Sequence, residues 1–468
     1  MPVAVSQTEK ESGMKRFVKM TWAVLFVLMT AVACSDDMNQ NPPASVYEAL
    51  AADPQFSQLV GLIDSEGLDE ALSGSGSYTV FAPTNAAFAA LPPDFLINVT
   101  VSQLLTYHVL AAEVDAAAAI AVAQSADPFV ETFESSDLEL YFDPSAEAAN
   151  QPALVLNGRV QVTTPDYATT GNGIVHTVDA VLFPDKNFPG TLVDVLSASP
   201  RFETLLGAVG NVPGLADVLA GPNGGAGFTL FAPTNVGFTL LPDGLVAGLS
   251  PADLEAVLQY HVLGATVDAA AAVGVATSGS PSVETVLAGQ FIDLSLDPVL
   301  SLFINTGSQV TTTDITVTNG VMHVLDSVLL PLDRLGAFPG TLVQALQAYP
   351  RYSSLVGAVV AADLVGALTD VTVFAPTNLA FESAQIPADI SVEDLTDVLR
   401  YHVLAGQVLA SGLTDPQPTL LSGASIEIDL LSDPVVLDGA IDVIEVDVQA
   451  SDGVIHVING VLQPPPAP

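Results

Sequence analysis

The sequence is poor in cysteine and in basic residues. It contains one cysteine, Cys34, among 468 residues, which excludes any disulfide within the chain and any metal site built from several cysteines. Only 10 residues are Lys or Arg, against 52 Asp or Glu, so the formal net charge is −42. A surface with this charge repels phosphate backbones, and we therefore exclude nucleic acid as a partner.

The N-terminus lacks an apolar run long enough to cross a bilayer. Residues 21–32 form a run of about a dozen, mostly apolar residues, whereas a spanning helix needs roughly 20. A basic cluster at residues 15–19 precedes this run. The order predicts a signal peptide over residues 1–34, and the sequence leaves open whether Met1 or Met14 is the true start.

Cys34 stands at the end of the predicted signal peptide. It follows three small or aliphatic residues, 31–33, and precedes Ser35, an arrangement that resembles the cleavage site of a bacterial lipoprotein. The resemblance implies that Cys34 becomes a lipid-modified N-terminus, held at the outer membrane or cell surface. Ordinary secretion with a chance cysteine is the alternative. A tether over residues 35–43 then leads to the folded part.

One phrase occurs three times, as an apolar run that ends in Phe-Ala-Pro-Thr-Asn and is followed by a further Phe. It covers residues 78–88, 228–238 and 371–381, so the copies are 150 and 143 residues apart. This spacing corresponds to a whole domain rather than to a solenoid repeat of roughly 20–50 residues. The phrase predicts a strand that ends at the Pro and a short helix capped by Thr84 or Asn85.

Every histidine of the sequence falls in one of two repeated positions. One position follows a Tyr at the end of a predicted helix, and the other lies in the predicted closing strand of each copy. The first set is Tyr107-His108, Tyr260-His261 and Tyr401-His402, and the second is His176, His323 and His456. Helical spacing and strand alternation place the histidines on buried faces. We expect imidazoles that bond to backbone carbonyls and hold the corner of each copy.

A metal or catalytic site at these histidines is the competing interpretation. Zinc sites use three or four ligands, and no Cys, Asp or Glu stands beside these residues at a ligand spacing. The sequence contains no Gly-x-Ser-x-Gly, His-Glu-x-x-His or phosphate-loop motif. The dense acidic residues after 428 lack the spacing of a calcium loop and favour a solvated face. We expect no cofactor, no metal and no enzymatic activity.

Together, the Ala-Pro-Thr-Asn corner, the Tyr-His helix end and the closing strand with its His resemble the fasciclin (FAS1) domain. The resemblance covers roughly residues 43–464 in three copies, and the motifs arrive in the family's order. It implies an α+β fold of three tandem domains, each a twisted β-sandwich or wedge with packed short helices. The third copy departs at Asn459, where the others have Asp179 and Asp326.

The resemblance also implies extracellular adhesion rather than catalysis. In animal relatives the Tyr-His region is credited with receptor binding, which makes the three Tyr-His pairs adhesion candidates here. The hypothesis is a lipid-tethered surface protein that binds another cell, matrix or surface polymer through weak multivalent contacts. An envelope protein that binds a glycan or a small ligand is the alternative. The predicted domains cover residues 44–184, 188–332 and 338–464, with a disordered tail at 465–468.

Overall fold

The computed structural model describes residues 43–465, with gaps at 97–98, 126, 144–152, 279–280, 298–300, 306, 332–337, 339, 385, 387–389 and 433. The predicted signal peptide with Cys34, the tether up to residue 42 and the last three residues of the tail lie outside the described residues. Among the helices of the described part, none has the length and apolarity needed to cross a membrane.

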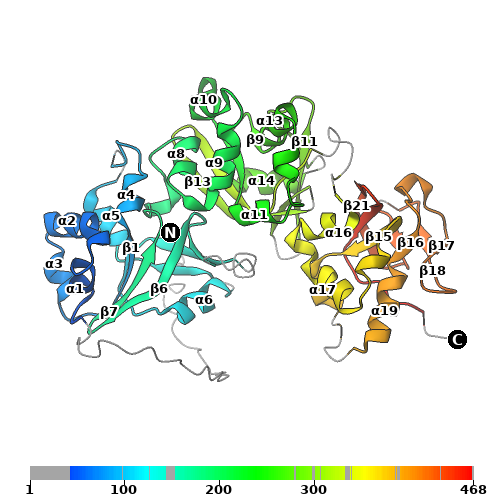
Figure 1. Ribbon diagram of the computed structural model, residues 1–468, viewed down its shortest axis with the longest axis horizontal. Helices are drawn as coiled ribbons and strands as arrows, with labels where there is room; N and C mark the ends of the chain where they lie inside the picture. Colours follow the sequence, from blue (N-terminus) through cyan, green and yellow to red (C-terminus); the bar gives the residue numbers. More distant parts are fainter. Residues whose placement is uncertain are drawn as a thin grey trace, which may run out of the picture. The chain divides into compact units, whose positions relative to one another are not determined.

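The first domain begins with helices and closes with a long hairpin (Figure 1). Its helices are α1 Val46–Ala51, α2 Ser57–Glu66, α3 Asp69–Ser73, α4 Asn85–Ala89, α5 Val101–Tyr107 and α6 Ala116–Ala123, with short 3-10 turns η1 Pro54–Phe56 and η2 Pro184–Lys186. Its strands are β1 Tyr78–Pro83, β2 Val109–Leu110, β3 Phe129–Glu131, β4 Asp137–Phe142, β5 Leu154–Leu156, β6 Val160–Thr170 and β7 Gly173–Val178. The described strands form one sheet in the order β2-β1-β7-β6-β5-β4-β3.

The second domain repeats this plan. Its helices are α8 Leu192–Ser197, α9 Glu203–Gly210, α10 Leu215–Ala220, α11 Asn235–Thr239, α12 Leu245–Gly248, α13 Pro251–Tyr260 and α14 Ala269–Ala276, with 3-10 turns η3 Pro200–Phe202 and η4 Asn223–Gly225. Its strands are β8 Phe228–Pro233, β9 Val262–Leu263, β10 Ser282–Glu284, β11 Phe291–Leu296, β12 Leu302–Ile304, β13 Ser308–Val317 and β14 Gly320–Leu325. The described sheet has the same order of equivalent strands.

The third domain is the shortest copy and has a smaller described sheet, in the order β16-β15-β22-β21-β20-β19. Its helices are α16 Leu342–Gln347, α17 Ser353–Ala361, α18 Asn378–Ala384 and α19 Val392–Tyr401, with 3-10 turns η5 Pro350–Tyr352, η6 Val365–Ala367 and η7 Ala410–Gly412. Its strands are β15 Val371–Pro376, β16 Val403–Ala405, β17 Gln417–Pro418, β18 Ser425–Ile426, β19 Ile428–Asp429, β20 Val436–Leu437, β21 Ile441–Ala450 and β22 Gly453–Ile458.

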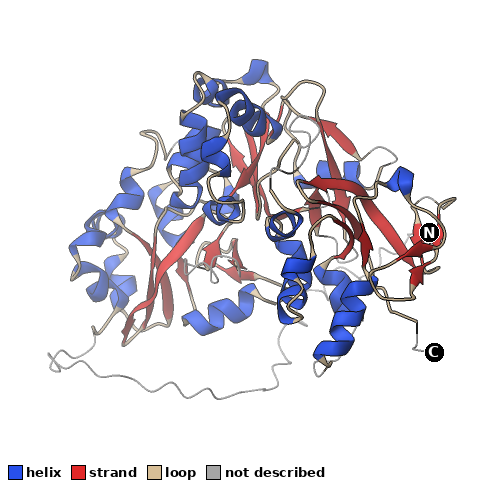
Figure 2. Cartoon of the chain, turned by 45° about the vertical axis from the view of Figure 1, so that its right-hand side comes forward, coloured by secondary structure: helices blue, strands red, loops and turns tan. Residues whose placement is uncertain are grey.

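Each sheet joins the beginning of its domain to the end. The strand of the Ala-Pro-Thr-Asn phrase runs parallel to the closing strand, and Phe81 lies opposite His176 in the register. The same pairing joins β8 to β14 and β15 to β22. Figure 2 shows helices packed along the sheets. Alternate side chains of β1 therefore enter different cores: Val80 belongs to the helix-covered core, and Phe81 belongs to a second core inside the curled sheet.

The predicted corner is confirmed in the first domain. The strand β1 ends at Pro83, and the Thr84 hydroxyl accepts from the Ala87 N–H as the N-cap of α4. Asn85 reaches further, because its side chain accepts from the N–H of Gln58 at the start of α2 and donates to the carbonyl of Pro54. The corner therefore also fixes the neighbouring helix.

Two predicted strands differ from the structure. The apolar alternation of the sequence predicts a closing strand that continues to Leu182, but β7 ends at Val178, where the Asp179 carboxylate accepts from the Gln161 N–H and the chain bends. The pattern of residues 425–431 predicts one strand, but the structure splits it into β18 and β19, and Leu431 projects into solvent with 98% exposure. Apolar residues at a strand end thus extended both predictions too far.

Candidate adhesion sites at the Tyr-His corners

The histidine of each corner links the end of a helix to the end of the domain. His108 is the C-cap residue of α5, and its Nδ1 lies 2.7 Å from the carbonyl oxygen of Leu104. Its Nε2 lies 2.9 Å from the N–H of Leu182, beyond the closing strand. Because a carbonyl only accepts and an N–H only donates, Nδ1 carries the proton and Nε2 accepts. The ring is therefore neutral.

The other two corners repeat these bonds. The equivalent partners are Val257 and Leu329 around His261, and Val398 and Leu462 around His402, at 2.7–2.9 Å. Burial in an apolar core lowers the pKa of His108, His261 and His402 to about 4. All three corner imidazoles are consequently uncharged at neutral pH.

The tyrosine hydroxyl of each corner bonds to the next layer of the sheet. Tyr107 donates to the carbonyl of Asp137 at 2.9 Å and accepts from Asn157 Nδ2 at 3.0 Å. The second domain repeats the pair with Tyr260, Phe291 and Asn305, whereas Tyr401 lies within hydrogen-bond distance of the Ser425 carbonyl and the Asp438 carboxylate. Desolvation raises the pKa of Tyr107 to about 12.

The histidine of each closing strand is held in the opposite tautomer. His176 Nε2 donates to the carbonyl of Val114 at 2.8 Å, and Nδ1 accepts from the N–H of Asp166 at 3.0 Å. Its ring stacks on Phe81 with centroids 5.4 Å apart. Burial lowers its pKa, while the nearby Asp166 carboxylate acts in the opposite direction. The same contacts recur at His323 with Val267, Asp314 and Phe231, and at His456 with Val408, Asp447 and Phe374.

All twelve imidazole nitrogens thus face a backbone partner. In the described part of the chain, no group of three or more His, Cys, Asp or Glu is placed to hold a metal ion. The paired nitrogens support the structural role that we propose for the six histidines.

The six adhesion candidates lie beneath the surface. Their exposed fractions range from 1% to 6%: Tyr107, His108, Tyr260, His261, Tyr401 and His402. A partner that docks on the folded domains therefore does not reach these side chains. The surface beside each corner is formed by other residues, which the sequence analysis did not single out.

One exposed apolar residue stands beside each corner. Phe133 is 55% exposed, Val286 is 40% exposed and Leu420 is 39% exposed. Each donates its backbone N–H, at 2.7 Å, to the carbonyl of the residue that follows the corner histidine, which is Val109, Val262 or Val403. The corner thus fixes one outward-facing apolar side chain in the same place on every domain. We call these three residues the corner contacts.

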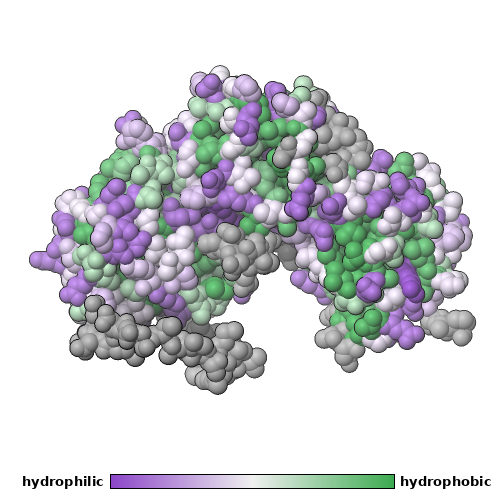
Figure 3. Space-filling model, viewed as in Figure 1, coloured by the Kyte–Doolittle hydropathy of each residue, from purple (hydrophilic) through white to green (hydrophobic). Residues whose placement is uncertain are grey.

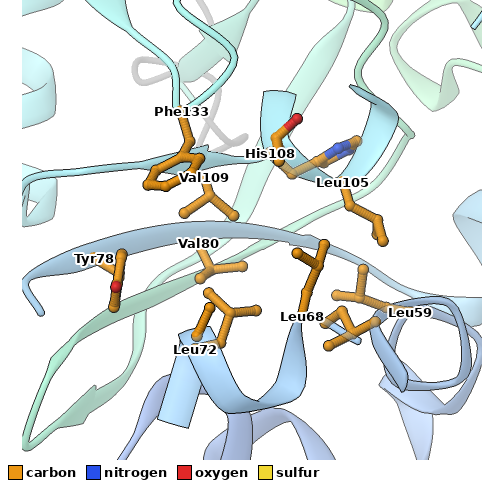
Figure 4. Close-up of a pocket in the computed structure, with 12 residues that line it drawn as sticks. Leu59, Leu68, Leu72, Tyr78, Val80, Leu105, His108, Val109 and Phe133 are labelled. Atoms are coloured by element: carbon orange, nitrogen blue, oxygen red, sulfur yellow. The ribbon is translucent and has the colours of Figure 1, made fainter. Parts of the chain in front are cut away.

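In the first domain the corner contact covers a small apolar cavity of about 50 Å³ (Figure 4). Phe133 lies over Val109 on one side, and Val80 faces them from the strand β1. Opposite them lie Leu59 of α2, Leu72 of α3 and Leu68, the residue before α3. The cavity is therefore lined almost wholly by aliphatic and aromatic carbon.

Comparison with known proteins identifies the family. The sequence profile described as "Fasciclin domain" matches residues 54–184, 200–331 and 350–464. The chain belongs to the fasciclin-domain family. Pig transforming growth factor-beta-induced protein ig-h3 is 27% identical over 441 residues, which cover 90% of this chain and 58% of that protein. Human periostin is 25% identical over 443 residues, which cover 91% of this chain and 48% of that protein.

A cyanobacterial relative matches a single copy. Protein sll1483 of Synechocystis is 38% identical over 136 residues, covering 27% of this chain and 74% of that protein. The solved fasciclin-domain pair of the insect cell adhesion molecule fasciclin I is 19% identical, with a TM-score of 0.35, and covers 60% of this chain and 98% of that structure. The chain spans about half the length of the longer relatives that it matches, ig-h3 and periostin.

The junction between the first two fasciclin domains contains buried charge. Arg201 donates from one guanidinium nitrogen to the carbonyl of Gly158 at 2.6 Å and from another to the Asp143 carboxylate at 2.7 Å. Arg159 bonds to the carbonyl of Val181, and desolvation lowers its pKa to about 10. The count of ten basic residues gives no sign of these contacts, because Arg201 bonds to residues of the preceding domain that are 43 and 58 positions away in the sequence.

Proposed function

We propose that this chain is a non-enzymatic adhesion protein of the cell surface, whose fasciclin domains each present one corner contact to another cell, matrix or surface polymer. The observation that carries the proposal is the repetition of an exposed apolar side chain, at one backbone position, in all three domains. Because both nitrogens of each imidazole have a backbone partner, we assign the Tyr-His pairs a structural rather than a chemical role. Family membership agrees with the adhesion that the sequence resemblance implied.

Three weak sites on one chain bind cooperatively when they engage one surface. Each corner contact is a single apolar side chain, and burying one such side chain yields only about 1.5–3 kcal/mol. A second and third contact made by an already bound chain form at high effective concentration, which raises the overall affinity by roughly 10²–10⁴. The proposed partner is therefore a repetitive surface rather than a soluble monomer.

The proposal includes a lipid anchor at Cys34 and a place at the cell envelope. Cys34 lies outside the described residues, so this part rests on the sequence of the predicted signal peptide. Mass analysis of the mature N-terminus tests it. We expect a chain that begins at Cys34 with an attached lipid, and a chain that begins elsewhere or carries no lipid would contradict the anchor while leaving adhesion open.

Substitution of the corner contacts tests adhesion. Cells that display the full chain are compared with cells that display Phe133→Ser, Val286→Ser and Leu420→Ser together, and with cells from which the chain is deleted. We expect the triple variant to attach and aggregate as weakly as the deletion. The matched control replaces three similarly exposed valines outside the corners: Val218→Ser, Val360→Ser and Val392→Ser. Equal loss in the control, or unchanged attachment in the corner variant, would contradict the proposal.

The cavity of the first domain favours a second candidate function, which is binding of a small apolar ligand. Its volume of about 50 Å³ and its carbon lining suit a small hydrocarbon group and not a glycan, whose hydroxyls need polar partners. Xenon titrated into the full chain should shift the methyl resonances of Leu59 and Val80. Unshifted resonances at saturating gas pressure would remove this candidate.

A further inference from the structure

The junction between the second and third fasciclin domains contains a polar cavity of about 850 Å³. This volume lies within the range of roughly 300–1,000 Å³ that is typical of ligand pockets. Its wall includes Asp243, Gln309 and Asp326 of the second domain and Gln347, Tyr349 and Arg351 of the third. Each of these six residues lies within the described part of the chain. We call this space the junction cavity.

The arginine at the junction cavity lacks the partners that its counterpart has at the first junction. Arg201 in η3 and Arg351 in η5 each follow the proline that opens the turn. Arg201 donates to the Gly158 carbonyl and the Asp143 carboxylate. The guanidinium of Arg351 lies over the Phe303 ring, 4.6 Å from its centroid, and within the described residues its buried Nε and Nη1 have no hydrogen-bond partner. Since buried polar groups are normally satisfied by protein or by a bound molecule, we expect a hydrogen-bond acceptor in the ligand.

A second difference between the junctions concerns Arg159, which is buried at the first junction with 3% exposure. It stands two positions before the residue whose N–H bonds to the Asp179 carboxylate. Two positions before the residue that bonds in the same way to Asp326, the second domain has Gly307. A Cβ on Gly307 would meet the Tyr349 ring at 3.1 Å. An aromatic ring therefore lies where the first junction has a cation, and this ring forms part of the cavity wall.

Several polar side chains at the cavity wall are available to a ligand. Among the described residues, the side chains of Gln309, Gln347 and Asp243 form no hydrogen bond with the protein. An amide side chain donates and accepts hydrogen bonds, and a carboxylate accepts them. A sugar hydroxyl also donates and accepts, so it can pair with each of these groups. The face of the Tyr349 ring offers an apolar surface against which the C–H groups of a sugar ring can pack.

The charges around the junction cavity favour a neutral ligand. Asp243 and Asp326 line the wall together with one cation, Arg351. The whole chain carries a formal net charge of −42, and Figure 3 shows hydrophilic residues over all three domains. This charge repels an anionic ligand. For a metal ion, the described residues include no suitably placed group of three or more His, Cys, Asp or Glu.

We propose that the junction cavity binds a short, neutral oligosaccharide. The unpaired amides and the carboxylate bond to its hydroxyls, and the tyrosine ring packs against one sugar face. The cavity of the first domain differs in this respect, because its carbon lining offers a sugar hydroxyl almost no partner. The junction cavity contains none of the corner contacts, so the proposal goes beyond the proposed adhesion and stands independently of it.

An array of immobilised oligosaccharides tests the proposal with the labelled full chain. The array carries neutral oligosaccharides of several linkages, together with counterparts of the same length that bear uronate or sulfate groups. We expect saturable binding to at least one neutral oligosaccharide, at least tenfold tighter than to its acidic counterpart. An array on which no neutral oligosaccharide is bound, or on which the acidic counterpart is bound equally well, would overturn the proposal.

Variants of the full chain locate the site by calorimetry with the neutral oligosaccharide that binds most tightly. Gln309→Ala and Gln347→Ala are combined in one chain, which loses two amides that bond to no described protein group and should therefore fold normally by circular dichroism. We expect this double variant to bind at least tenfold more weakly, because two hydrogen bonds to the ligand are lost. Asp243→Ala, at an exposed position, should also weaken binding and provides a second folded variant.

Two further chains serve as controls. Gln58→Ala combined with Gln124→Ala removes two exposed amides of the first domain and should bind the oligosaccharide as the parent does. The triple serine variant of the corner contacts should also bind as the parent does, which separates this site from the proposed adhesion. Unchanged affinity in the folded cavity variants, or an equal loss in either control, would overturn the proposal.

Discussion

Replacement of His261 by glutamine distinguishes two contributions of a corner histidine to stability: its hydrogen bonds, which glutamine can partly replace, and its protonation, which glutamine cannot. His261→Gln removes a group whose pKa is lowered to about 4 by burial, against an ordinary value of about 6.5. Glutamine of similar reach does not titrate. At pH 7 we expect a loss of about 1–3 kcal/mol in the free energy of opening the second domain, because the bonds to Val257 and Leu329 are remade imperfectly.

The pH dependence is the sharper part of this prediction. Between pH 6.5 and 4 the unfolded chain binds a proton at His261 that the folded domain excludes, so the stability that His261 contributes falls as the pH falls. A shift of this size corresponds to roughly 3 kcal/mol in total, of which about 2 kcal/mol is lost between pH 7 and pH 5. Burial raises the pKa of Asp326 in the same domain to about 7, which acts in the opposite direction, but Asp326 is present in both proteins and cancels in the comparison.

Hydrogen exchange measured by mass spectrometry on the full chain provides the readout. The peptide that covers β8, Phe228–Pro233, reports on the second domain, because the Phe231 N–H bonds to the His261 carbonyl. The peptide that covers β1 reports on the first domain, where His108 is intact, and serves as the internal control. For β8, the free energy of opening should be higher in the parent than in the variant at pH 7, and we expect this difference to fall by about 2 kcal/mol at pH 5. A difference that stays constant would refute a buried, neutral His261.

Three further outcomes are expected. Arg201→Met breaks the buried ion pair with Asp143 and should lower the free energy of opening the first junction by roughly 3–5 kcal/mol. We expect faster proteolysis within residues 184–190. Adding Asp143→Leu should restore resistance to the protease, and a double variant that is cut as fast as Arg201→Met would contradict the pair. Gly320→Ala would drive a Cβ against the backbone of Phe228 and should lower the melting temperature, whereas Gly207→Ala, with open space, should hold or raise it; equal effects would contradict this packing. With a net charge of −42, the melting temperature should rise between low and moderate salt, and a flat or falling value would count against surface self-repulsion.

Local signals in the sequence were sufficient for the corner and the helix that ends in His. Ser followed by Pro is a typical helix start, and Ser250 caps α13 with Pro251 in its first turn, while Ser391 caps α19. The phenylalanine that follows the Thr-Asn cap, Phe88, is buried in the core. These features depend on residues within one turn of each other, so propensity and capping chemistry determine them.

Features that depend on distant partners were not predictable in the same way. Asn157 and Asn305 reach the corner tyrosines from a left-handed backbone conformation, with φ of 47° and 49°. A single asparagine in a loop carries no periodic signal for such a contact. The exposure of Phe133 was not predictable either, because an apolar residue in the turn after a strand resembles a core residue until the fold is known.

Replacement of the corner contacts one at a time tests most directly the claim that each domain contributes one adhesive contact. The measurement is the dissociation rate of the full chain from a target cell surface, for proteins with three, two, one or no corner contacts replaced by serine. We expect dissociation to accelerate with each further replacement, whichever of Phe133, Val286 or Leu420 is replaced first, because each domain contributes an equivalent contact. A rate that changes only with one domain, or with none, would contradict it.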